Sequence, residues 1–202
     1  GLEDLSLIDL IVRTGIHDAI ARRLNQSGKL SNNAIAETII NNVRKTIIRS
    51  HLTDPRFYDK MSKLLDDLIQ QNRDSAEAYE EFLKKAEALA RQLTSRQSGS
   101  SMPDCLHGNP AAQVIYRNLP DIVATDKVPE NTASEPSPEY GDHLAQLALK
   151  IDRAMQDEAP ANWRGDSVKE NQVKNLLHPL TGKDRDATLK LFELIRNQSA
   201  YP

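Results

Sequence analysis

Five residues with cationic or titratable side chains lie close together in the sequence, namely Arg44, Lys45, Arg49, His51 and Arg56. Positive charges at this density can neutralise phosphate groups or bind an acidic partner, and such binding weakens as salt rises. The whole chain carries a net charge of −3, so a contact with nucleic acid would depend on this local patch. The cluster therefore has two interpretations, a contact with DNA or an acidic partner, and a solvent-exposed flank of a helix.

The only tryptophan, Trp163, is followed by Arg164 in a segment predicted to be a loop between helices. Tryptophan and arginine are common anchors of protein interfaces. The structural alternative is a tryptophan that fills the seam between two helices, with its ring nitrogen hydrogen-bonded. Trp163 and Arg164 thus join the candidate partner or DNA contacts Arg44, Lys45, Arg49 and Arg56.

Two short pairs resemble parts of metal sites. His17-Asp18 has the residue types of HD-type metal phosphohydrolases, but that chemistry needs another histidine upstream, and nothing upstream of His17 qualifies. Cys105 and His107 could each bind zinc, but a structural zinc site needs four ligands, and no second pair follows at a suitable spacing. An HD-like hydrolase is the enzymatic alternative, and we expect no catalytic residue, metal or cofactor in this chain.

The sequence lacks the patterns that bind nucleotides or cut DNA. A phosphate-binding loop needs Ser or Thr after Gly-Lys, whereas Leu30 follows Gly28-Lys29 and Asp184 follows Gly182-Lys183. No Asp/Glu-any-Lys triplet is present for metal-dependent nuclease chemistry, and no Gly-any-Ser-any-Gly turn for a hydrolase serine. We therefore interpret the chain as an interaction domain.

Helices must position these residues, because apolar residues recur at intervals of three and four along most of the chain. Helix-forming residues dominate, and only 4% of the residues are aromatic. We predict an all-α fold, a helical bundle with two helical halves joined by Pro/Ser-rich loops. The N-terminal half covers 1–94 with about four helices, loops with one short helix near 110–119 cover 95–141, and the C-terminal half covers 142–202 with about three helices.

The chain has no apolar run near the ~20 residues needed to cross a bilayer, so we expect no membrane segment. Its single cysteine, Cys105, rules out an internal disulfide and fits a cytoplasmic location. The sequence begins inside a helical pattern with no capping residue ahead of it, from which we expect a fragment of a longer polypeptide.

Three stretches, 34–69, 109–119 and 147–180, resemble the C-terminal helical region of the restriction (R, or HsdR) subunit of type I restriction-modification enzymes, in order and spacing. The matching words are Asn42-Val43-Arg44, Tyr58-Asp59-Lys60-Met61-Ser62, Ile151-Asp152, and Trp163-Arg164 leading into Lys169-Glu170-Asn171. The Pro-rich segment 120–141 departs from the family, in which a shorter connection is expected.

The resemblance implies a parent enzyme that is an ATP-dependent, site-specific deoxyribonuclease. Its nuclease domain and two motor domains, with their ATP and Mg²⁺, would lie in the rest of the R subunit. The region matched here would dock the motor onto the methylase (M) and specificity (S) subunits. The alternative is a helical domain that contacts double-stranded DNA directly and guides it to the motor.

Overall fold

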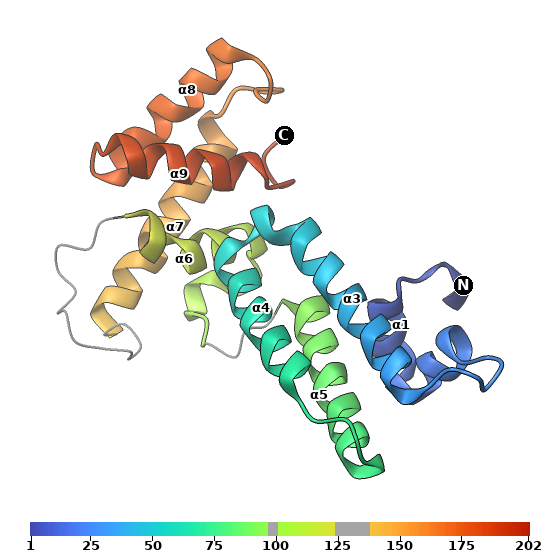
Figure 1. Cartoon of the computed structure of the whole chain (residues 1–202). Coiled ribbons are helices and arrows are strands. Elements are labelled where there is room, and N and C mark those ends of the chain that lie inside the picture. The colour runs from blue at the N-terminus through green and yellow to red at the C-terminus, as the bar shows by residue number, and fades with distance from the viewer. Residues whose placement is uncertain (97–100, 124–137) are drawn as a thin grey trace. The chain divides into compact units, whose positions relative to one another are not determined.

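The computed structural model describes residues 1–96, 101–123 and 138–202, and all regular structure within these ranges is helical (Figure 1). The absence of strands from the described ranges confirms the predicted all-α class. The described residues form two compact units. The first takes in the described residues among 1–51 and 57–100, and the second those among 52–56 and 101–202.

The first unit is built from five α-helices: α1 (Leu7–Thr14), α2 (Ile16–Ala19), α3 (Asn32–Ser50), most of α4 (Pro55–Gln70), and α5 (Ala76–Ser95). Its shorter elements are a 3-10 turn at Leu2–Asp4 and a π-helical turn at Ile20–Leu24. A further 3-10 turn, His51–Thr53, follows α3 directly.

Serine side chains begin three of these helices. Ser6, Ser31 and Ser75 accept hydrogen bonds from the backbone N–H groups three residues ahead, over 3.0–3.2 Å. A serine oxygen in this place satisfies one of the donors that the first turn leaves unpaired. The Ser6 cap corrects the expectation that the first helix has no capping residue. Asp74 and Glu77 have the spacing of a capping box, but Ser75 is the residue that caps α5.

The core of the first unit is aliphatic with few aromatic rings. Helix α1 packs against α3 and α5, and α4 adds its apolar face to the same core. The side chains that solvent does not reach include Ile11, Ala19, Ile39, Val43, Met61, Phe82, Ala86 and Ala90. Packing of this kind stabilises amphipathic helices more than their intrinsic propensity does.

The second unit contains α6 (Pro110–Ile122), α7 (Pro138–Glu158), α8 (Ser167–Leu177) and α9 (Arg185–Arg196), with 3-10 turns at Asp104–Leu106 and His178–Thr181. Helix α6 packs against α7 and α9, and α8 packs against α7 and α9. Its fully buried side chains include Leu106, Ile115, Leu119, Ala148, Ile151, Trp163, Val173, Leu177, Leu191 and Ile195.

Both ends of the Pro-rich segment predicted as a loop over 120–141 are helical. Helix α6 continues through Pro120 to Ile122, and α7 begins at Pro138. The remainder, 124–137, lies outside the described residues, as does 97–100. Within the described ranges, no helix has the length and apolar character that crossing a membrane requires.

Candidate interaction surface

The basic residues singled out in the sequence lie on the solvent side of α3. Val43 and Ile47 are 0% and 6% exposed and fix the helix against the core of the first unit. Arg44, Lys45 and Arg49 fall on the opposite side and are exposed. They share this side because residues three and four apart are neighbours on a helix surface.

Ile48 stands among these cations. Apolar periodicity alone would assign Ile48, like Ile47, to the buried side of this helix, but its side chain is 70% exposed. Consecutive residues on a helix point about 100° apart, so Ile47 and Ile48 cannot both face the core. We call the surface formed by Arg44, Lys45, Ile48 and Arg49 the α3 face.

The other two members of the basic cluster have partners of their own. The His51 imidazole lies 2.8 Å from a carboxylate oxygen of Asp59. Arg56 belongs to the second unit and forms a 2.8 Å ion pair with Asp121, with both side chains more than half exposed. Within the part of the chain that the structure describes, the members of the basic cluster without a carboxylate partner are therefore the cations of the α3 face.

Trp163 lies in the core of the second unit and is 0% exposed. Its ring centre is 5.6 Å from that of Phe192, at an interplanar angle of 57°. The ring nitrogen has no hydrogen-bond partner among the described residues, although the sequence led us to expect one. The ring therefore fills an interior position of this unit, and its role in a partner contact stays a prediction.

The guanidinium of Arg164 lies over the Trp163 ring, 4.5 Å from its centre. It donates hydrogen bonds to the backbone carbonyls of Ile195 (3.4 Å), Arg196 (2.9 Å), Gln198 and Tyr201. These carbonyls are at and just beyond the end of α9, where a helix leaves acceptors unpaired. Burial lowers the pKa of Arg164 from its usual value. Arg164 thus binds the loop between α7 and α8 to the residues at and after the end of α9.

A buried polar cluster in the second unit was not predicted from the sequence. Asp54, which is 0% exposed, accepts hydrogen bonds from Arg117 Nε at 2.9 Å and Asn118 Nδ2 at 2.8 Å. The Asn118 side-chain oxygen in turn accepts the backbone N–H of Arg56 at 2.9 Å. The cluster joins the segment 52–56 to α6. Arg117 and Asn118 follow Asp54 by 63 and 64 residues in the sequence, a separation that no local sequence pattern reveals.

A second buried carboxylate, Asp152 on α7, organises the end of the chain. It accepts hydrogen bonds from Tyr201 Oη at 2.5 Å, Asn109 Nδ2 at 2.9 Å and Gln156 Nε2 at 3.1 Å. Burial, followed by the hydrogen bond and charge of Asp152, raises the pKa of Tyr201 well above that of an ordinary tyrosine. Asp152 thus fixes residue 201 into the second unit.

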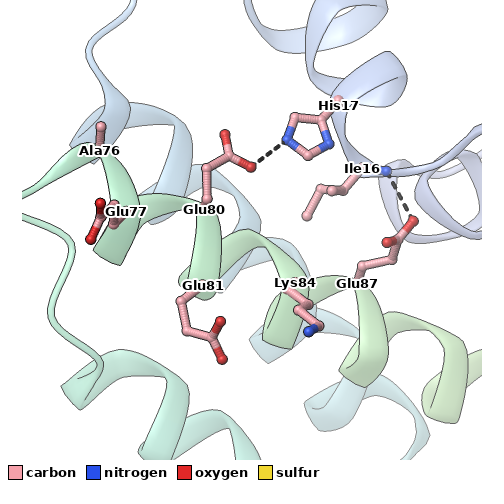
Figure 2. A pocket seen from close by; sticks show the side chains of 8 residues that line it. All are labelled: Ile16, His17, Ala76, Glu77, Glu80, Glu81, Lys84 and Glu87. Carbon is pink, nitrogen blue, oxygen red and sulfur yellow. Dashed lines mark hydrogen bonds and ion pairs between the residues drawn. The ribbon is translucent and has the colours of Figure 1, made fainter.

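The His17-Asp18 pair does not converge on a common point. His17 Nε2 lies 2.7 Å from Glu80 Oε2 across a groove of about 620 Å³ (Figure 2), whereas Asp18 pairs with Arg22 in the π-helical turn that follows α2. Glu87 accepts the backbone N–H of Ile16 at 3.1 Å, which satisfies a donor at the start of α2. These contacts join α2 to α5. No group of three or more His, Cys, Asp or Glu side chains suited to a metal occurs in the part of the chain that the structure describes.

Comparison of the chain with protein-family models, with curated proteins and with solved structures finds no match.

Proposed function

We propose that the chain is a non-catalytic docking domain, the C-terminal helical region of the R subunit of a type I restriction-modification enzyme. In this role it holds the ATP-dependent translocase and nuclease on the methylase-specificity core. The observation that carries the docking role is the α3 face, where exposed cations surround an exposed isoleucine on a helix fixed by its buried side. Charged groups that flank an apolar anchor are features of surfaces that bind proteins.

The family assignment rests on the sequence resemblance, and the positions of the resembling words are compatible with it. Val43, Tyr58, Met61, Ile151 and Trp163 come from four different words, and all are at most 3% exposed. The words therefore supply core residues to both units. Two sequences that share such words in order would be expected to share the helical framework that these residues hold together.

A docking domain of this kind acts by shape, charge and buried apolar area. The chain itself would bind neither ATP nor Mg²⁺, which the rest of the R subunit would use. The M and S subunits of the same system are the proposed protein partners, in the cytoplasm.

Binding of the purified chain to the methylase-specificity core tests the proposal. We expect the chain to associate with the M and S subunits in a pull-down and to compete with the intact R subunit for them. The intact R subunit serves as the positive control. If it associates with the core and the isolated chain does not, docking by this region is wrong.

Direct contact with double-stranded DNA is the second candidate. It is favoured by Arg44, Lys45 and Arg49, three exposed cations without an ion pair to any described carboxylate. Their replacement by Glu should then weaken duplex binding and reduce the salt dependence of the affinity. Unchanged affinity for duplex DNA in this variant would remove the second candidate.

A further inference from the structure

Several exposed arginines among the described residues pair with a carboxylate, whereas the cations of the α3 face do not. Arg22, Arg56 and Arg196 each lie 2.7–3.3 Å from an Asp or Glu oxygen. Among the cations of the α3 face, the one recorded side-chain contact is that of Arg44 with the amide oxygen of Asn41, at 3.0 Å. The face therefore presents three positive charges that the described part of the chain does not neutralise.

Ile48 adds an apolar centre to this charge. At 70% exposure it is more exposed than any other large apolar side chain among the described residues. A single exposed apolar residue is common on protein surfaces and needs no explanation. Ile48 is surrounded by unneutralised cations on the same helix turns, so this surface combines an apolar contact with positive charge. Its neighbours Arg44 and Arg49 are four residues before it and one after it.

The helix dipole accounts for part of this arrangement. Cations near the C-terminus of a helix are stabilised by its unpaired carbonyls, and Arg49 is in the last turn of α3. The effect fades beyond one turn and is indifferent to an apolar side chain, so it does not account for Ile48. A phosphate backbone would satisfy the cations but would leave Ile48 without a complementary surface.

We infer that the α3 face binds an acidic amphipathic segment of a partner protein, whose carboxylates pair with Arg44, Lys45 and Arg49 and whose apolar side chain covers Ile48. The charge complementarity and the exposed apolar centre together favour this occupant over nucleic acid. The inference deepens the docking role and rests on it for the existence of a protein partner.

The apolar contact is tested with Ile48→Ala in the full chain, titrated into the purified methylase-specificity core in a calorimeter. Ala has a higher helix propensity than Ile, and the site is exposed, so the fold is retained. We expect binding about tenfold weaker, as for the loss of a buried interface anchor. The matched control is Val168→Ala on α8, which removes an apolar side chain that is 66% exposed and should leave the affinity unchanged.

The charge contact is tested with the triple variant Arg44→Glu, Lys45→Glu, Arg49→Glu. The control variant carries the same change in net charge at three other exposed cations of the first unit, Arg13, Lys29 and Lys63. We expect the α3 variant to bind at least about a hundredfold more weakly than the control variant, because it places like charges opposite the partner's carboxylates. Raising the salt concentration should weaken binding of the unchanged chain more than that of the α3 variant.

The outcomes separate this inference from the docking role. Absence of binding by the unchanged chain would overturn the docking role and the inference with it. Binding that is unaffected by Ile48→Ala, or weakened equally by the two triple variants, would overturn the inference alone. Loss of duplex DNA binding by the α3 variant, with binding to the core retained, would also overturn it and make nucleic acid the occupant.

Discussion

Removal of the Asp54 carboxylate by Asp54→Ala should destabilise the second unit strongly. Asp54 is 0% exposed and is bound by Arg117 at 2.8 and 2.9 Å and by Asn118 at 2.8 Å. The substitution leaves the guanidinium of Arg117, which is 11% exposed, without this counter-ion. Breaking a buried ion pair from one side costs roughly 3–5 kcal/mol of unfolding free energy.

The only tryptophan of the chain provides the assay. Trp163 is in the core of the second unit, so its fluorescence in a urea titration follows the unfolding of that unit. With a urea dependence of about 2 kcal/mol per molar, the expected cost lowers the midpoint by roughly 2 M. Asp121→Ala is the matched control, because it breaks a 2.8 Å ion pair of the same unit in which both side chains are more than half exposed. It should cost less than about 1 kcal/mol.

A double-mutant cycle with Arg117→Met completes this test. If the ion pair is the cause, adding Arg117→Met to Asp54→Ala should recover part of the lost stability, because the uncompensated charge is removed. A midpoint for Asp54→Ala equal to that of Asp121→Ala would refute the reasoning, since burial would then have no effect on the cost.

Three further substitutions follow from the geometry. Gly15→Ala should lower the free energy of unfolding by about 1–3 kcal/mol, because Gly15 has φ 88° and ψ 155°, a conformation strained for alanine. A urea titration followed by far-UV circular dichroism measures this loss, and an unchanged midpoint would contradict it. Arg164→Lys should cost roughly 1–3 kcal/mol of unfolding free energy in a urea titration followed by Trp163 fluorescence, because one ammonium cannot bind four carbonyls. A lysine variant as stable as the unchanged chain, and more stable than a methionine variant, would instead assign the role of Arg164 to its charge. Because the pKa of Tyr201 is raised in the folded chain, the unfolded chain loses the phenol proton first, and stability should fall as pH rises above about 10. Tyr201→Phe should reduce this fall in urea midpoints measured between about pH 9 and 11. An equal fall in both proteins would refute this reasoning.

The helices could be predicted from the sequence because their apolar periodicity is local. Apolar residues recur at intervals of three and four along the segments that form α3, α4, α5 and α9. Their detailed ends were less predictable, since several residues compete for each cap. At α8, Ser167 and Glu170 have the spacing of a capping box, but the Asp166 side chain accepts the N–H groups of Val168 and Lys169. Glu170 accepts the N–H of Gly165.

The buried polar clusters could not be predicted, because their members are far apart in the sequence. Asp54 reads locally as a residue ahead of a helix-starting proline, yet its carboxylate binds α6. Asp152 reads as a polar residue on an amphipathic helix, yet the phenol that it holds is 49 residues away. Such contacts depend on the tertiary fold, which the periodicity of single helices does not specify.

Different residues of α3 hold the framework of the first unit and form the exposed α3 face. Val43 and Ile47 are packed in the core, so a substitution at either lowers the free energy of unfolding whatever the chain binds. Arg44 and Ile48 are exposed, so packing places little constraint on their identity and a change at either leaves the framework intact. Because the two sets alternate along one helix, substitutions at adjacent positions should separate folding from binding. A loss of binding to the methylase-specificity core that tracks the exposed set, at constant stability, can only come from the surface of α3.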